Sequence, residues 1–349
     1  MDGRIERNEW RSNGSLVRRL LIVLALLSLA LLSWRLSSVL LLAFGSVLIG
    51  IVLRAAADLV VRYTPVPERW SLAVAGSAML LLIALAGLLF GSQIASQSGQ
   101  LAQQLPSMID HAMQRFGIQG SLEQMLQGKG TAVAGGILSR VGSFGMAFAG
   151  GLANLLLMVI AGAFLASEPR LYRRGFVKLF PPREQERIEG TLLTTGRALR
   201  LWLLGKLATM ALVAVLTTLL LWLAGVPSPL ALGLLAGLAE FVTFVGPLVA
   251  GAVILIAALA GGVTTFAWAF AAVLVIQQLE SNIITPLVQR RAVDLPPALS
   301  LFAVLAFGTL FGTLGLLFGV PLAVVAYVVI KKLYVRDTLK EATPILGEG

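Results

Sequence analysis

Long apolar runs dominate the chain, and short polar or basic stretches separate them. Leu, Ala, Val and Ile fill these runs, without the alternation of polarity that marks a half-buried strand. A helix needs about 20 apolar residues to cross a hydrocarbon core about 30 Å thick. The pattern predicts an all-α polytopic integral membrane protein and excludes a β-barrel. We expect about eight membrane segments, at residues 20–34, 36–53, 71–91, 141–166, 207–224, 229–260, 263–278 and 297–330.

Two of these runs are too long for one plain span and are interrupted. The run 229–260 is interrupted at AEFVTFVGP, which ends at Pro247, and the run 297–330 is interrupted before Pro321, where four glycines precede the proline. Proline inside a helix removes a backbone hydrogen bond and clashes with the preceding turn. Each run is therefore either a long kinked helix or a re-entrant hairpin of two half-helices.

A weak internal repeat favours the hairpins. The segments 229–239 and 296–306 agree at seven of eleven positions. Interrupted segments at corresponding positions are typical of transport sites, because unwound backbone leaves peptide groups unpaired at membrane depth.

The basic residues predict the orientation. Four spans separate the Arg-rich N terminus from the segment Glu168 to Lys206, so both lie on the same side of the membrane. That segment has nine Lys or Arg residues, whereas residues 92–140 have three. Basic loops stay in the cytoplasm, so both termini are expected there. With hairpins, Arg290 and Arg291 also lie inside. We expect these regions: 1–19, cytoplasmic; 20–91, three spans; 92–140, external amphipathic helices; 141–166, a fourth span; 167–206, a basic cytoplasmic interfacial segment; 207–332, the membrane core; 333–349, a cytoplasmic tail.

Details within these regions are also predicted. The first two spans should form a tight helical hairpin around Arg35, with no cleavage site between them. Pro181 and Pro182 should end a short helix in the basic segment. After them, Leu199, Trp202 and Leu203 should mark an apolar face that Arg197, Arg200 and Lys206 border.

Composition narrows the chemistry. Apolar residues make up 58% and charged residues 13% of the chain, and mean hydropathy is +0.90. The net charge of +10 lies in clusters between apolar runs, which indicates lipid headgroup contacts rather than nucleic acid. Cysteine is absent, and the single histidine, His111, lies beside Asp110 in a polar stretch. No nucleotide-binding P-loop is present, so we expect no cofactor, no metal and no enzymatic activity.

Polar residues inside apolar runs are candidates for a site. Glu240 lies in the first interruption, where it is either a carboxylate held by backbone N–H groups or an arginine, or a proton- or cation-binding group. Glu280 follows an apolar span and either pairs with Arg290 or Arg291 or joins such a site. Gln278 and Asn282 lie beside it.

The order FVTFVGP, QQLESNIITPLVQRR and DLPPALSLFAVLAFGTLFGTLGLLFGVPLA resembles the C-terminal half of the autoinducer-2 exporter family. The layout of spans and amphipathic segments resembles that family over nearly the whole chain. One departure is the stretch from Glu240 to Thr243, where the family more often has an apolar or Asn-containing stretch. The matching positions are Gly246, Pro247, Gln278, Asn282, Pro286, Pro296, Gly312, Gly315 and Pro321.

The resemblance implies secondary transport in the bacterial inner membrane, by a homo-oligomer. Some family members export a small polar signal such as autoinducer-2, and sodium or lithium/proton exchange is proposed for others. The exporter predicts a polar cavity lined by Gln278, Asn282 and the two interruptions. The antiporter predicts a desolvated Glu240 or Glu280. A non-transport scaffold predicts no water-accessible path, and Gly312 and Gly315 would then serve only close packing.

Overall fold

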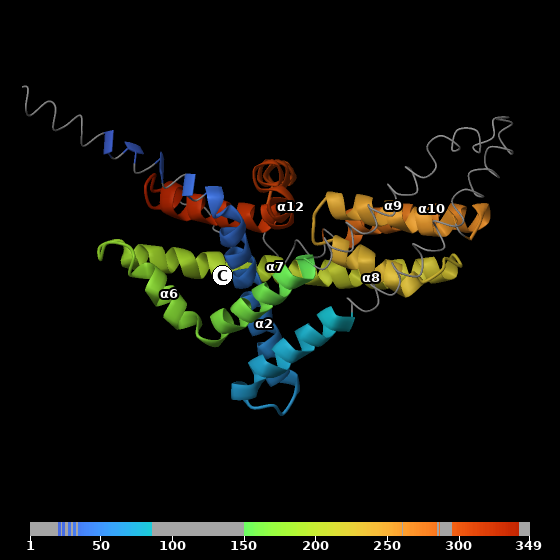
Figure 1. The fold of residues 1–349 in the computed structure, drawn as a ribbon, viewed down its shortest axis with the longest axis horizontal. Helices are drawn as coiled ribbons and strands as arrows, with labels where there is room; N and C mark the ends of the chain where they lie inside the picture. The colour runs from blue at the N-terminus through green and yellow to red at the C-terminus, as the bar shows by residue number, and fades with distance from the viewer. Residues whose placement is uncertain are drawn as a thin grey trace, which may run out of the picture.

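The described part of the protein is a set of long helices. The computed structural model describes residues 20–85 and 150–341, apart from residues 22, 25–26, 29–30, 33, 260, 285 and 287–294. Every regular element in these ranges is helical (Figure 1). The all-α polytopic membrane class is thus confirmed. Six described helices are long and apolar enough to cross a membrane: Ser37–Tyr63, Glu68–Leu85, Gly150–Ser167, Gln185–Leu223, Val263–Ile284 and Pro297–Arg336.

Large apolar side chains such as Leu81 and Trp222 are exposed on these helices, as expected for contact with lipid. Shorter helices complete the described fold. The labelled elements are α2 (Ser37–Tyr63), α6 (Pro169–Val177), α7 (Gln185–Leu223), α8 (Pro229–Ala239), α9 (Val245–Leu259), α10 (Val263–Leu279), the π-helix η1 (Glu280–Ile284), α12 (Pro297–Val329) and the π-helix η2 (Ile330–Arg336).

The first two apolar runs do not form the tight hairpin predicted around Arg35. The N–H of Leu36 donates to the carbonyl of Leu32 at 2.9 Å, and the N–H of Leu40 donates to that of Leu36 at 2.9 Å. Helical bonding therefore continues through the junction, and Leu36 only bends it (φ −90°, ψ 6°). That prediction is wrong because neither Arg35 nor Leu36 breaks a helix as glycine or proline does.

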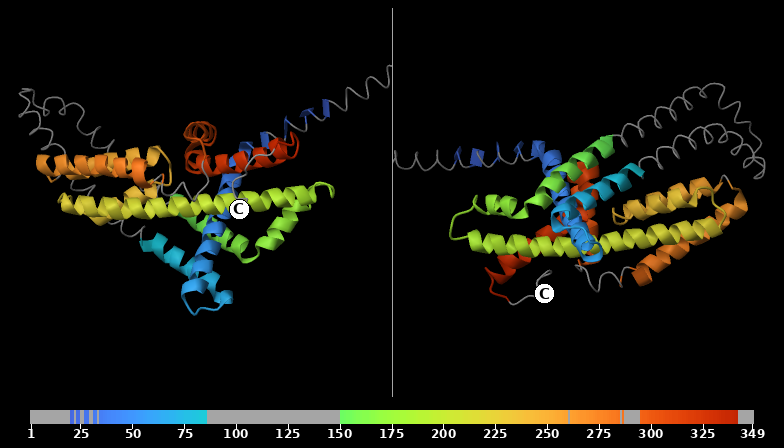
Figure 2. Two further views of the ribbon diagram at one scale, coloured as in Figure 1. Left: turned by 180° about the vertical axis from the view of Figure 1, so that it is seen from behind. Right: turned by 90° about the horizontal axis from the view of Figure 1, so that it is seen from below.

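Helix α7 is a continuous helix of 39 residues. It crosses the predicted boundary between Lys206 and Leu207 without a break and runs through the long axis of the molecule (Figure 2). The short helix α6 ends before Pro181 and Pro182, as predicted. The predicted apolar face of α7 at Leu199 and Leu203 is buried against other helices.

Helices α8 and α9 fold back on each other at the first predicted interruption. Five residues outside the two helices join them, and Phe244 among these has a φ of 68°. Ala236 of α8 and Ile254 of α9 line the same cavity, which a straight helix through both positions would not allow. The hairpin alternative is therefore the one that this segment adopts.

Helix α12 also folds back, at Gly312, where φ is 64° and ψ is −142°. A Cβ atom built on Gly319 would lie 3.0 Å from the Cα of Val304, so the two halves lie side by side. The break occurs at Gly312 and not at Pro321, which lies buried within the second half. Only glycine adopts such a conformation at little cost, which explains the position of the break.

Buried apolar residues form two clusters along α7. The cluster that we call the α12 cluster joins Leu199 and Trp202 of α7 to Val304, Phe318 and Val324 of α12. The α8–α9 cluster joins Val213 of α7 to residues of α8, α9 and α10. Helix α7 thus contributes to both clusters, and the candidate site lies in the second of them.

Candidate functional site

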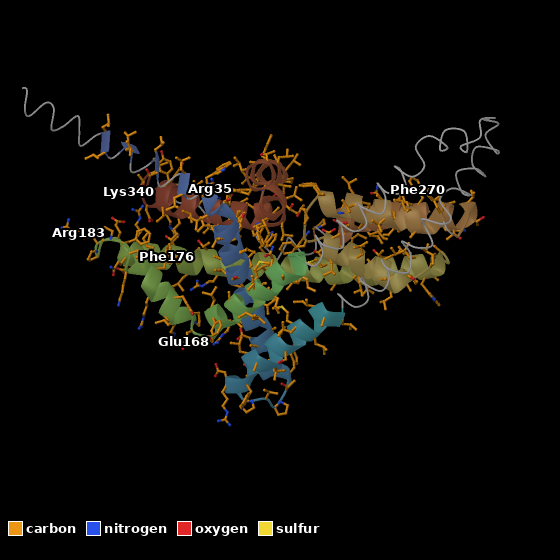
Figure 3. All side chains as sticks on the ribbon, in the orientation of Figure 1. Arg35, Glu168, Phe176, Arg183, Phe270 and Lys340 are labelled. Carbon is orange, nitrogen blue, oxygen red and sulfur yellow. The ribbon has the colours of Figure 1, made fainter. Side chains whose placement is uncertain are left out.

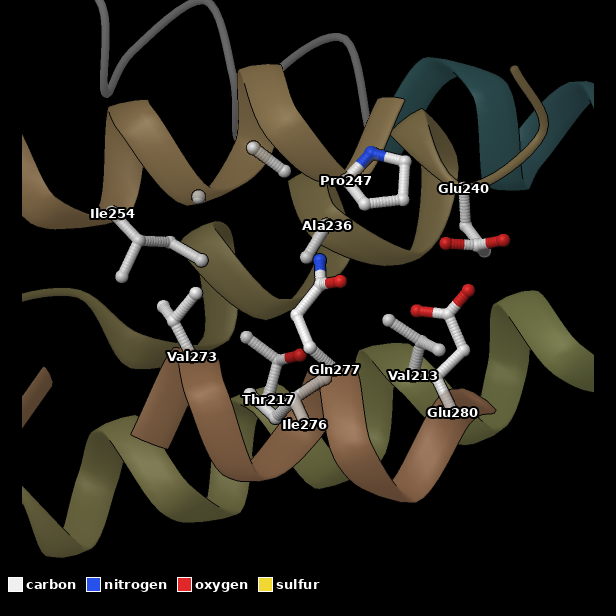
Figure 4. A pocket seen from close by; sticks show the side chains of 12 residues that line it. Val213, Thr217, Ala236, Glu240, Pro247, Ile254, Val273, Ile276, Gln277 and Glu280 are labelled. Carbon is white, nitrogen blue, oxygen red and sulfur yellow. The ribbon is translucent and has the colours of Figure 1, made fainter. Parts of the chain in front are cut away.

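A small cavity lies between α7, α8, α9 and α10, next to the first break (Figure 4). Its volume is about 30 Å³, enough for one or two water molecules. Most of its wall is apolar, and the polar exceptions are Thr217, Glu240, Gln277 and Glu280. The complete lining is Val213, Thr217, Ala236, Glu240, Pro247, Ala250, Gly251, Ile254, Val273, Ile276, Gln277 and Glu280.

Glu240 is the buried charge at the edge of this cavity. It directly follows α8, and only 3% of it is exposed. An anion at a helix C-terminus is destabilised by the helix dipole and needs a cation nearby. Lys206 of α7 provides it, since its Nζ donates to Oε1 of Glu240 at 2.6 Å. The partner is thus a lysine, and not the backbone N–H or arginine of the first of the two alternatives for Glu240.

Glu280 brings a second carboxylate to the same place. It begins the π-helix η1, and Figure 4 shows its carboxylate pointing toward that of Glu240. It lies within Coulombic range of both Glu240 and Lys206. π-Helical turns are frequent at functional sites, because they reorient side chains relative to a regular helix. Arg290 and Arg291, the partners suggested for Glu280, lie outside the described residues.

We call Lys206, Glu240 and Glu280 the charged triad. Two carboxylates and one ammonium leave an excess of one negative charge when all three are ionised. Burying uncompensated charge among apolar side chains is costly, so this excess favours uptake of one positive charge. A proton or a monovalent cation would supply it.

Two neutral polar side chains extend the triad into the cavity. The hydroxyl of Thr217 is fully buried and has no hydrogen-bond partner among the described residues. Gln277 lies one helical turn before Glu280 and also lines the cavity. This hydroxyl can pair with a polar group or an ion that enters the cavity.

The backbone of the first break is tightly constrained. The N–H of Gly246 donates to the carbonyl of Val242 at 2.8 Å. A Cβ atom on Gly246 would collide with the carbonyl oxygen of Ala239. Pro247 follows directly and lines the cavity. Gly246 thus allows the close turn that brings the start of α9 beside Glu240.

Three other candidate residues lie outside the cavity. Gln278 and Asn282 are both exposed, and the Nδ2 of Asn282 donates to Oε1 of Gln278 at 2.9 Å. Pro286 is exposed as well. The cavity contains Gln277 instead of its neighbour Gln278, which points to a different face of α10.

The second break is likewise separate from the cavity. Gly315 and Pro321 are buried within α12, where a Cβ atom on Gly315 would collide with the carbonyl oxygen of Phe307. Neither they nor Gly312 line the cavity. The structure therefore brings together Glu240, Pro247 and Glu280 but places Gly312, Gly315 and Pro321 elsewhere.

Lys206 is the site residue whose location differs from the one that the sequence pattern predicts. It lies at the end of a basic segment, where a lysine is typical of a membrane surface. In the structure its side chain is only 12% exposed. One indication in the sequence is Glu240, an acidic residue within the apolar run 229–260, because a buried carboxylate needs a cation as its partner. His111 and Asp110 lie outside the described residues.

Comparisons with known proteins find relatives that are named as transport proteins. The chain is 25% identical to YrrI of Bacillus subtilis (strain 168) over 45% of each chain, and YrrI is named as a transport protein. It is 35% identical to the transport protein MT0215 of Mycobacterium tuberculosis over 28% of this chain and 27% of that one. It is 26% identical to the transport protein YueF of Bacillus subtilis over 33% and 30%.

Each of these matches spans less than half of the relative's length. A wider match comes from the family described as AI-2E family transporter, which covers residues 20–335, nearly the whole chain. That range includes α2, the two folded-back segments and every residue that lines the cavity. The chain therefore belongs to the AI-2E family of membrane transporters.

Proposed function

We propose that the chain is a secondary transporter in which the charged triad binds the driving ion, a proton or a monovalent cation, and that it exports a small polar solute such as autoinducer-2. The single observation that carries the proposal is the triad itself. The buried carboxylate of Glu240 is 2.6 Å from the ammonium of Lys206, whose side chain is only 12% exposed, and the carboxylate of Glu280 points toward that of Glu240. Charged groups inside membrane proteins typically mark ion or substrate paths.

The size of the cavity supports the assignment of an ion to this site. A volume of about 30 Å³ holds one or two waters, or an ion without its hydration shell, but no sugar-sized molecule. The exported solute would then bind elsewhere or in another conformation. The family description and the transport relatives support membrane transport in general, and both the export direction and the solute are part of our proposal.

Contacts between distant segments support the orientation. Nε of Arg187, near the start of α7, donates to Asp337 at 2.7 Å, and Lys332 of η2 donates to the carbonyl of Gly190 at 3.1 Å. Arg183 and Lys340 lie at the same end of the molecule (Figure 3). The basic segment before α7 and the C-terminal segment are thus on one side, which we propose is the cytoplasm.

The location and the assembly are also part of the proposal. We place the protein in the bacterial inner membrane, with the lipid bilayer around its exposed apolar side chains. The resemblance suggests a homo-oligomer. The segment 92–140, which we expect to supply subunit contacts, lies outside the described residues.

Sodium or lithium/proton exchange is the second candidate function. The observation that favours it is the presence of two carboxylates, since oxygen ligands suit hard monovalent cations. Both candidates use the same triad and differ in the second transported species. A scaffold without transport is less compatible with a charged triad beside a cavity when one of its carboxylates, that of Glu240, is buried.

Proteoliposomes that contain a pH-sensitive dye test the proposal. Addition of autoinducer-2 should change the luminal pH if export is coupled to protons, whereas addition of NaCl or LiCl should do so if the protein exchanges cations for protons. E240Q and E280Q should each abolish the response, because each removes the excess negative charge of the triad that favours uptake of an ion.

The matched control is E186Q, which neutralises an exposed carboxylate in the first turn of α7, away from the cavity. It should behave as the wild-type protein does. A wild-type protein that gives no luminal pH change with any of these solutes would contradict the proposal, and so would a full response in E280Q.

A further inference from the structure

The role of Lys206 is not explained by ion binding alone. Two carboxylates that converge on a cavity are by themselves a suitable site for an alkali metal ion. Here an ammonium from α7 already occupies one of them, at 2.6 Å from Oε1 of Glu240. Its side chain is 12% exposed and that of Glu240 is 4% exposed, so this pair lies away from bulk water.

We propose that Lys206 determines which ion the site accepts: its ammonium takes the position of a metal cation at the Glu240 carboxylate, so that the site binds a proton and excludes sodium and lithium. This inference rests on the proposed function, which it makes more specific. The juxtaposition that carries it is one ammonium and two carboxylates from three different elements, at α7, at the end of α8 and at η1.

Charge balance is the first argument. With Lys206 bound to Glu240, the triad lacks one positive charge, which a proton on the Glu280 carboxylate supplies. Without Lys206, two carboxylates would lack two positive charges, and a metal ion would be attracted more strongly. Helix α9 contributes no charged group to the cavity, since its lining residues are Pro247, Ala250, Gly251 and Ile254.

Coordination is the second argument. A metal ion that leaves water needs several oxygen ligands in place of its hydration shell, whereas a proton needs one. The oxygen-bearing side chains that line the cavity are Thr217, Gln277, Glu240 and Glu280, and Lys206 engages one oxygen of Glu240. A protonated Glu280 would need no such shell. The remaining wall is apolar and offers no side-chain ligands.

The test compares ion binding in wild type and K206M, with thermal unfolding of the purified full-length protein in detergent as the readout. NaCl, LiCl and choline chloride at equal ionic strength are the probes. Wild type should unfold at the same temperature in all three salts. K206M should be stabilised by NaCl or LiCl relative to choline chloride, with an apparent affinity at least about tenfold above that of wild type.

K206R is the matched control, because it keeps the positive charge, and it should respond as wild type does. Since K206M leaves Glu240 without its cation and could fail to fold, the double variant K206M/E240Q provides a second test. It retains one carboxylate and the overall charge of the wild-type triad. It should show no sodium or lithium response, and its luminal pH response in proteoliposomes should persist.

The outcomes separate this inference from the proposed function. Sodium or lithium stabilisation of wild type, no salt-specific change in K206M, or a sodium response in K206M/E240Q would each overturn the role of Lys206. Proton coupling could still hold in those cases, since the E280Q experiment tests it independently. Conversely, a gained sodium response in K206M supports the role of Lys206 even if no transported solute has been found.

Discussion

The two folded-back segments share an architecture but differ in chemistry. Each starts at a proline, in α8 and in α12, and each reverses at a short non-helical break. The first break places Glu240 beside Lys206 and a cavity. The second places Gly312 next to apolar and aromatic residues, where Phe307 and Phe311 stack with centroids 6.1 Å apart.

This difference shows that a broken helix is not by itself a binding site. Unwinding frees backbone groups in both segments. Among the described residues, charged side chains from neighbouring helices lie at the first break, whereas apolar side chains pack near the second. Gly312 itself is exposed, and the nearby Phe307 and Phe311 pack against the α12 cluster. We expect changes at the first break to alter ion binding and changes at the second to alter stability alone.

The largest effect should come from Glu240→Ala. It leaves the ammonium of Lys206 buried without its partner, and loss of one member of a buried pair typically destabilises by about 3–5 kcal/mol. Chemical unfolding in detergent measures this. The double variant K206M/E240A should recover most of the loss, because neither charge remains. A loss under about 1 kcal/mol would show that the pair is solvated.

The next-largest effects should come from substitution of the glycine at each break, and they distinguish the two breaks directly. Gly246→Ala forces a Cβ atom against the Ala239 carbonyl and should cost about 1–3 kcal/mol, with loss of the pH response. In Gly312→Ala the new Cβ atom meets no neighbouring atom, but alanine must adopt an unfavourable φ. The loss of stability should also be about 1–3 kcal/mol. The pH response of this variant per folded molecule should persist. If G312A removes that response, the second break also takes part in transport.

Thr217→Val should have a smaller effect, which raises the stability of the protein and lowers its affinity for the driving ion. Valine has nearly the same shape and removes a buried hydroxyl without a partner, so stability should rise by about 1 kcal/mol. Affinity for the driving ion should fall about two- to tenfold if the hydroxyl faces it. Unfolding and the concentration dependence of the pH response measure the two. Loss of stability would indicate that an ordered water or ion normally satisfies this hydroxyl.

The smallest effect is expected from Asn282→Ala. The side chain is exposed, and its hydrogen bond to Gln278 joins two residues of the same helical stretch. Stability should change by less than about 0.5 kcal/mol and the pH response by less than about twofold. A strong transport defect would place this exposed face in the solute path, and the cavity would then be only part of the site.

Much of this fold follows from sequence patterns, for physical reasons. Apolar runs must be helical in lipid, so the membrane helices and the first break were predictable. The second break was harder to locate, because both Gly312 and Pro321 disrupt helices and only tertiary packing decides between them. The bend at Leu36 was not predicted, since no sequence feature marks it.

The site was only partly predictable. Glu240 is conspicuous as a charge in an apolar run, but its partner Lys206 precedes it by a loop and two helical stretches, and local patterns do not encode such contacts. Gln277 and Gln278 differ by about 100° around α10, which is apolar on all sides and gives no periodic indication of its inner face. Side-chain direction there depends on the fold.

The unbroken length of α7 has a mechanical consequence. Trp202 of α7 lies in the α12 cluster, where it contacts Phe241, and Leu221 of α7 lies in the α8–α9 cluster. About 28 Å of helix separates Trp202 from Leu221, at 1.5 Å per residue. A helix without a hinge behaves as a stiff rod over this distance. Motion that opens the ion cavity toward either side of the bilayer must therefore tilt or slide whole helices, and a local gate within α7 is not available.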